Sequence, residues 1–164
     1  MTLASKALKV IAPLAIAAAA MTAASAASAN CPAWEYDATA TIQGTGAQFW
    51  QPQYYSVVAG GNTDVSYCNV ARQTNATGYV ATSPDFELYY DGANGYDLEI
   101  RVVGNCDTTL LINTANSAWR FDDDSYGDLQ PRIYLPNAQP GTYDIWVGTF
   151  GSQLCNAELV VETF

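Results

Sequence analysis

Alternation of apolar and polar residues is the feature that most constrains how this chain can fold. It is clearest in residues 96–103, where apolar side chains occupy every second position and Asp97, Glu99 and Arg101 lie between them. Successive side chains of a strand point to opposite faces, so this period of two predicts a strand with one buried face. Further short strand-like runs occupy residues 53–59, 64–68, 78–82, 86–90, 106–112, 132–135, 143–148 and 154–161.

Turn-forming residues separate these runs, for example Gly60-Gly61-Asn62 and Pro140-Gly141. Beyond residue 29, no stretch shows sustained helical periodicity. About eight to ten short strands at this spacing are typical of an all-β protein. We therefore expect an antiparallel β-sandwich or jelly roll, formed by a single domain over residues 30–164.

The N-terminal 29 residues have the pattern of an export signal. Two lysines precede an apolar run at residues 10–20, and small residues follow it. This pattern predicts a secretory signal peptide over residues 1–29, with cleavage after Ala26 or Ala29. We therefore expect a secreted protein that acts in the periplasm, on the cell surface or outside the cell.

This N-terminus has two alternative interpretations. An uncleaved membrane anchor is disfavoured, because the apolar run is too short to span a bilayer. Lipidation of Cys31 is disfavoured, because Asn30 stands where a small residue is expected before a lipidated cysteine. We expect no membrane insertion after the signal is cleaved.

The mature chain is strongly acidic. Both lysines lie in the predicted signal peptide, which leaves four arginines against sixteen acidic residues and a net charge of −12. Nucleic acids and anionic membranes need basic residues to neutralise phosphate, so neither is expected as a partner. The charge is compatible with divalent cations, with cationic partners or simply with solubility.

Four cysteines form an even set, as expected of disulfides in an exported protein. Three pairings are possible. Cys106 and Cys155 each fall in phase with the apolar side of the run that follows them, so they could meet across a core. We predict Cys106–Cys155, with Cys31–Cys68 tying down the N-terminus. A zinc site is the rival interpretation, but there is no histidine and no Cys-x-x-Cys pair.

The absence of histidine removes most catalytic machinery. Ser-His-Asp triads, Cys-His dyads and histidine-based zinc hydrolase motifs are all excluded. Ser-Lys chemistry also requires a residue that the mature chain lacks. Carboxylate chemistry remains. A hydrolase that uses paired acids is therefore the one enzyme class still open, and it is the least favoured function for this chain. We expect a protein that is not an enzyme.

The turn at residues 122–128 contains four carboxylates, a hydroxyl and a glycine. Hard cations such as Ca²⁺ take oxygen ligands from such loops, although the spacing is not that of an EF-hand. The competing interpretation is a solvated turn in which carboxylates act only as turn formers. The predicted ligands of a calcium site are Asp107, Asp122, Asp123, Asp124 and Asp128.

Five blocks of the chain, residues 86–90, 107–113, 119 with 122–125, 129–132 and 141–148, follow one another in this order. Together they resemble the bacterial pre-peptidase C-terminal (PPC) domain. The resemblance covers residues 78–161 and is closest to short stand-alone exported proteins, often catalogued as serine peptidases. It implies a β-sandwich or jelly roll that aids secretion, substrate attachment or surface targeting, in some members with calcium. No peptidase active-site motif matches.

Exposed aromatic residues could form a contact platform for a ligand. Trp146 shares a strand face with Asp144, opposite the expected core residues Tyr143, Ile145 and Val147. It is therefore our choice for a ligand contact. The competing interpretation is that it covers the second face or an edge of a sheet.

Three functional hypotheses follow from the sequence. The first is a secreted, non-catalytic module for binding, adhesion or targeting that is stabilised by calcium and contacts an extracellular protein or polysaccharide. The second is a structural subunit of an envelope or extracellular assembly, in which edge strands allow self-association. The third is the carboxylate-based hydrolase.

Overall fold

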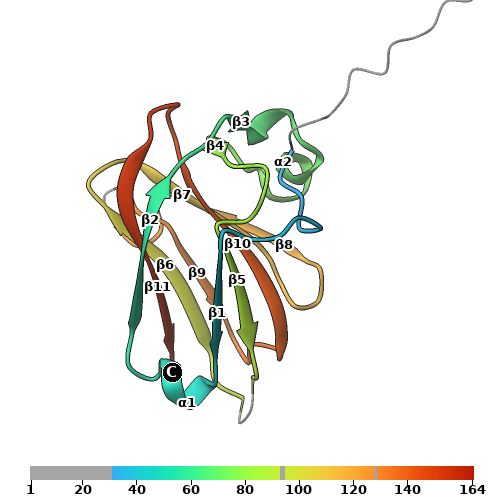
Figure 1. The fold of residues 1–164 in the computed structure, drawn as a ribbon, viewed down its shortest axis with the longest axis vertical. Coiled ribbons are helices and arrows are strands. Elements are labelled where there is room, and N and C mark those ends of the chain that lie inside the picture. Colours follow the sequence, from blue (N-terminus) through green and yellow to red (C-terminus); the bar gives the residue numbers. More distant parts are fainter. Residues whose placement is uncertain (1–30, 93–94, 128) are drawn as a thin grey trace, which may run out of the picture.

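The computed structural model describes residues 31–92, 95–127 and 129–164, and these residues form a β-sandwich. A seven-stranded sheet, here sheet A, packs against a four-stranded sheet, here sheet B. Helix α1 (Gly46–Phe49) and the C-terminus lie at one end, and α2 (Asn69–Thr74) lies at the other (Figure 1). The predicted all-β sandwich is confirmed. The predicted signal peptide lies outside the described residues.

Sheet A is built around β10, which pairs with β5 and then β4 along one edge and with β7 along the other. These pairings are antiparallel, as predicted, but β1 pairs with β5 in parallel. No hairpin joins β1 to β5, because the chain visits sheet B between them. The strands are β1 (Ala40–Gly44), β3 (Thr63–Asp64), β4 (Tyr79–Val80), β5 (Phe86–Tyr90), β7 (Thr108–Asn113), β8 (Trp119–Asp122) and β10 (Gly141–Thr149).

Sheet B is antiparallel throughout, in the order β2-β11-β6-β9. The alternation seen in the sequence places Leu98, Ile100 and Val102 inside, where each is 0% exposed. They pack against the inner side chains of sheet A in the main hydrophobic core. The strands are β2 (Gln53–Ala59), β6 (Leu98–Gly104), β9 (Arg132–Leu135) and β11 (Cys155–Thr163).

Both predicted disulfides are present. Cys106–Cys155 joins the segment before β7 to the first residue of β11, with 6.5 Å between the Cα atoms. Cys31–Cys68 joins the start of the described chain to the residue before α2, with a Cα separation of 5.7 Å. The described residues contain no helix long and apolar enough to cross a membrane.

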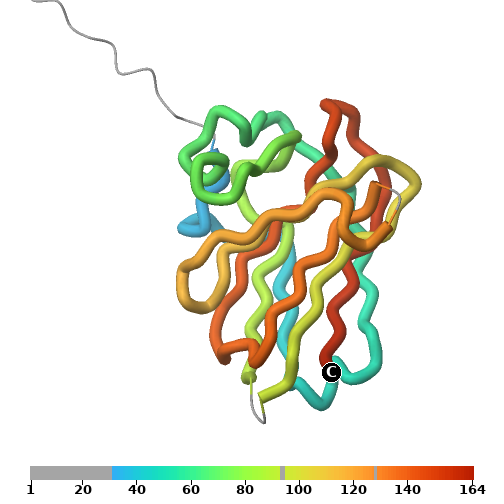
Figure 2. The backbone as a smooth tube through the Cα atoms, turned by 180° about the vertical axis from the view of Figure 1, so that it is seen from behind, coloured from blue at the N-terminus to red at the C-terminus, as the bar shows by residue number. Residues whose placement is uncertain are grey.

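A second, smaller core lies on the outer face of sheet A, and we call the chain that covers it the cap (residues 31–39 and 60–77). Figure 2 shows the two cap segments, blue and green, at the same end of the molecule. Trp146 and Leu111 of the sheet are each 0% exposed and pack here against Val65 and Val70 of the cap. The outer face of sheet A is therefore only partly open to solvent.

Trp146 is thus not a surface contact, and the prediction that it meets a ligand is wrong. Its ring lies 5.3 Å from that of Trp119, and its Nε1 donates to the carbonyl of Thr82 at 3.3 Å. Its strand face was assigned correctly, opposite Tyr143, Ile145 and Val147. Period-two alternation identifies a strand face but does not reveal which segment covers it.

The cap also explains a second wrong prediction from the sequence, the strand expected over residues 64–68. Only Thr63–Asp64 is extended, and a 3-10 helix follows at Val65–Tyr67. The Asp64 carboxylate accepts from the Ser66 amide at 3.0 Å and caps this turn. The helices of the cap are too short to show periodicity in the sequence.

Truncating Trp146 should lower the free energy of unfolding far more than truncating an exposed tryptophan. We expect Trp146→Ala to lower the free energy of unfolding by about 3–5 kcal/mol, since it leaves a cavity in the second core. The control Trp34→Ala, at a side chain 52% exposed, should cost less than about 1 kcal/mol. Guanidinium denaturation of the mature protein measures both, and equal losses would contradict the assignment.

Asp85, the residue before β5, is expected to make the folding stability depend on pH. Its Oδ2 accepts from the Val147 amide at 2.7 Å. Burial raises the pKa of Asp85 to about 7, although this hydrogen bond opposes the rise. Because the folded pKa lies above the unfolded value of 3.8, the native state holds the proton more tightly. The resulting stability is present below about pH 4 and is lost as pH rises through about 7.

Replacing Asp85 with asparagine should therefore flatten this part of the pH profile. Wild-type stability is expected to fall between pH 4 and 8, with a contribution from Asp85 of up to about 4 kcal/mol. Asp85→Asn keeps an oxygen for the Val147 amide but no longer titrates. Thermal melts across this range test the prediction, with the exposed Glu158→Gln as a control of equal charge change. Parallel profiles for wild type and Asp85→Asn would contradict it.

Candidate functional site

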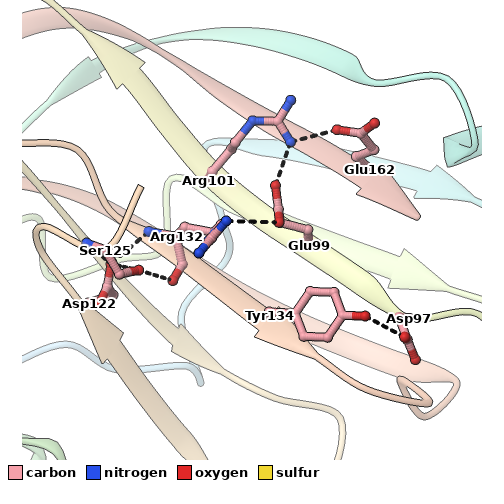
Figure 3. Close-up of polar contacts among 8 residues, drawn as sticks. All are labelled: Asp97, Glu99, Arg101, Asp122, Ser125, Arg132, Tyr134 and Glu162. Atoms are coloured by element: carbon pink, nitrogen blue, oxygen red, sulfur yellow. Dashed lines mark hydrogen bonds and ion pairs between the residues drawn. The ribbon is translucent and has the colours of Figure 1, made fainter. Parts of the chain in front are cut away.

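The predicted calcium turn begins at the end of β8, where Asp122 acts as a hydrogen-bond acceptor. Its Oδ2 accepts from the Ser125 amide at 3.1 Å, the Ser125 hydroxyl at 2.8 Å and the Arg132 amide at 2.7 Å. The Ser125 hydroxyl also lies 3.0 Å from the Arg132 carbonyl, so this segment is tied to β9 (Figure 3). One predicted ligand therefore has a structural role in closing the turn.

The other predicted ligands lie close enough to influence one another electrostatically. Burial raises the pKa of Asp107, and the charges of Asp124 and Asp123 raise it further. Burial also raises the pKa of Asp123, with smaller contributions from Asp124 and Asp122. Within residues 31–92, 95–127 and 129–164, however, no group of three or more acids or cysteines is arranged to hold a metal. Asp128 lies outside the described residues, and calcium binding stays a prediction.

The adjoining outer face of sheet B carries an ion network around Arg101, whose Nε is buried without a partner among the described residues. Arg101 Nη1 contacts Glu99 at 2.8 Å and Glu162 at 2.7 Å (Figure 3). Arg101 and Arg132 also lie over the ring of Tyr126, at 5.3 and 5.9 Å from its centroid. Each charge of this network already faces an opposite charge or an aromatic ring. We therefore expect the network to stabilise the outer face of sheet B rather than to bind a ligand.

A groove of about 450 Å³ lies on the outer face of sheet A. We call it the acidic groove. Glu87 of β5 lies directly opposite Asp144 of β10, and Asp144 lies directly opposite Asn113 of β7. Residues opposite one another share a sheet face, so three strands present these side chains in one row. The groove is lined by Trp34, Glu35, Glu87, Asn113, Thr114, Ala115, Ser117, Thr142 and Asp144.

The cap supplies one wall of this groove. Trp34 and Glu35 belong to the segment that begins at the Cys31–Cys68 disulfide. Backbone hydrogen bonds hold that segment along the chain before β5, from Ala33 to Thr82 and from Thr39 to Pro84, each at 3.0 Å. The same disulfide that closes the second core therefore positions an exposed tryptophan beside the acidic row.

The β7–β8 turn supplies the opposite wall. The Thr114 hydroxyl contacts Asn116 Oδ1 at 2.7 Å and the Ala118 carbonyl at 2.8 Å, while the Ser117 amide donates to the Thr114 carbonyl at 2.7 Å. Ser117 has a φ of 59°, in the left-handed region that a tight turn requires. This wall is therefore held by its own hydrogen bonds.

Asp144 is the most unusual group in the groove. It is 7% exposed, and in the described part of the chain its carboxylate accepts no hydrogen bond and forms no ion pair. Burial raises its pKa to about 6, and the charges of Glu87 and Glu35 contribute. Neighbouring Asn113 is 5% exposed, and within the same described residues its side-chain amide also has no hydrogen-bond partner. Neither side chain supplies one of the fully enclosed, unpartnered polar atoms of the described residues, so the polar atoms of both stay accessible from the groove.

Sequence reasoning placed Asp144 on the correct strand face but did not identify it as a site residue. The strand register that aligns it with Glu87 and Asn113 is a tertiary feature. Trp34 is one of the tryptophans that could form a contact platform, but it lies outside any strand-like run, so the sequence could not place it beside Asp144.

Comparison with known proteins gives little further guidance. No protein-family model matches the chain, and no curated protein matches it. Among solved structures it is similar to Aeromonas hydrophila PliG, a periplasmic lysozyme inhibitor of g-type lysozyme, at 13% identity and a TM-score of 0.42. The match covers 76% of this chain and 96% of that one. At this TM-score it supports no conclusion about function, and the PPC resemblance stays a prediction.

The two roles considered for Asp122 can be separated by mutation. Asp122→Ala leaves three donors without their acceptor and should cost about 1–2 kcal/mol of unfolding free energy, whereas exposed Asp124→Ala should cost less than about 0.5 kcal/mol. Urea denaturation measures this difference, and equal costs would contradict the structural role. If calcium binds as the sequence predicts, millimolar calcium would raise the wild-type Tm over that in chelator, and Asp122→Ala would abolish the rise.

Proposed function

We propose that the protein is an exported, non-catalytic binding module whose partner docks at the acidic groove. The observation that carries this proposal is Asp144, a buried carboxylate without a hydrogen-bond partner among the described residues, which lines a groove beside the exposed Trp34. An unpaired buried charge costs free energy unless a ligand compensates for it. The partner is an extracellular protein or polysaccharide.

Export is supported by the signal-peptide pattern and by the pairing of all four cysteines in two disulfides. A non-catalytic role is supported by the lack of histidine and, after signal cleavage, of lysine. Calcium stabilisation at the Asp122 turn remains a separate part of the proposal, tested by the melts described above.

A carboxylate-based hydrolase is the second candidate, and one observation favours it. Glu87 and Asp144 are neighbours across β5 and β10, and the pKa of Asp144, at about 6, suits a general acid. The described lining adds a third acid, Glu35, with an amide and hydroxyl groups, but no histidine or lysine. Binding remains the better supported function.

Titration of the ¹⁵N-labelled mature protein with small probes tests the proposed function. The panel contains glucose, N-acetylglucosamine and the amides of arginine, lysine, citrulline and glutamate. We expect saturable chemical-shift changes confined to the groove residues for at least one probe. A parallel screen with nitrophenyl glycosides and a protein substrate should show no turnover.

Two outcomes would overturn this function. One is the absence of saturable binding at the groove by every probe in the panel. The other is turnover that disappears in both Glu87→Gln and Asp144→Asn, which would establish the hydrolase instead.

A further inference from the structure

We propose that the acidic groove binds the guanidinium group of an arginine presented by a partner protein. This inference rests on the proposed function and names the ligand of the same site. Among the described residues, the groove is lined by three acids, Glu35, Glu87 and Asp144, and by no basic residue. Its electrostatic field therefore selects a cation and rejects phosphate or carboxylate groups.

The acceptor row matches a planar group with several donors. Glu87, Asp144 and Asn113 occupy neighbouring strands in register, and such neighbours have Cα atoms about 4.5–5.5 Å apart. A guanidinium carries five N–H donors in a rigid fork, so it can donate to two adjacent acceptors at once. A lysine ammonium is a point charge and cannot use the row in the same way.

Trp34 adds an aromatic surface to this acidic row. Its side chain is 52% exposed and lines the groove. Guanidinium groups stack on tryptophan faces by cation–π attraction, and Arg is found in such pairs more often than Lys. A desolvated cation beside both an indole and carboxylates gains from each contact.

In the free protein, burial of the Asp144 carboxylate costs desolvation free energy, and a bound cation would offset that cost. Asp144 is more than nine-tenths buried, and among the residues described here nothing donates to its carboxylate. The charged groups that face it are Glu87 on β5 and Glu35 on the cap, while β7 contributes the neutral Asn113. A bound guanidinium would therefore hold Asp144 ionised and release its proton at mildly acidic pH.

A protein partner fits better than a polysaccharide. The groove volume of about 450 Å³ lies towards the low end of small-molecule sites, enough for one side chain and its flanking peptide. The mature charge of −12 would also steer basic proteins towards this surface and speed their association. Binding should therefore weaken with added salt.

Calorimetry with the peptides Ac-Gly-Arg-Gly-NH₂ and Ac-Gly-citrulline-Gly-NH₂ tests the inference, because citrulline keeps the shape of arginine without its charge. We expect the arginine peptide to bind at least tenfold more tightly than the citrulline peptide and several-fold more tightly than the lysine analogue. Affinity should rise several-fold from pH 5 to pH 7.5.

Groove variants and a matched control complete the test. Asp144→Asn should lower affinity for the arginine peptide at least tenfold and remove its pH dependence, and Trp34→Ala should lower affinity several-fold. Glu158→Gln removes the same charge from the outer face of sheet B and should change affinity less than twofold. Melting temperatures of Asp144→Asn and Trp34→Ala that are not markedly below that of the wild type would show that neither effect reflects unfolding.

The failure of this inference is distinguishable from failure of the proposed function. Equal affinity for the two peptides, with a neutral sugar bound at the groove, would overturn the inference and leave the binding module intact. Tighter binding of a glucosamine oligomer than of the arginine peptide would overturn the inference that the partner is a protein. Loss of binding in Glu158→Gln equal to that in Asp144→Asn would overturn the assignment to the groove.

Discussion

Burial of Trp146 beneath the cap is the contact on which the rest of the structure depends. A two-sheet sandwich needs only one buried face on each sheet, yet sheet A buries Trp146 and Leu111 on its outer face as well. Covering them requires the cap, and the Cys31–Cys68 disulfide holds the cap in place. The edge of that cover is where the acidic groove forms. Packing on one part of the face therefore shapes the groove beside it.

The acidic residues of this protein fall into two physical classes. Some are satisfied within the fold, as Glu99 and Glu162 are by Arg101, or Asp122 is by the donors of its own turn. Asp144 belongs to the other class, because it is buried and none of the described residues donates to it. Satisfied acids stabilise the architecture, whereas Asp144 lines the groove without a partner among the described residues and stays accessible from it. This contrast, rather than the density of carboxylates, distinguishes the groove from the acidic turn.

Local patterns in the sequence predicted most of the sandwich. Strands β2, β5 and β9 have the predicted bounds, because alternation and flanking turns are local properties. The disulfide pairing was also predictable, since the phase of Cys106 and Cys155 indicated a shared side. The cap was not predictable, because its short helices have no periodicity and its packing joins segments distant in sequence. Trp146 was assigned to the correct face but not to the correct environment for the same reason.

The sequence by itself determined an all-β fold, the pairing of its cysteines and a strongly acidic character, since each follows from residue type and spacing. Only the tertiary structure decided which acids lie together in the acidic groove. Strand register set Glu87, Asp144 and Asn113 side by side, and the cap brought Trp34 and Glu35 to them. Register and cover arise from pairings between distant segments, and burial of a charge depends on those pairings rather than on its neighbours in the chain.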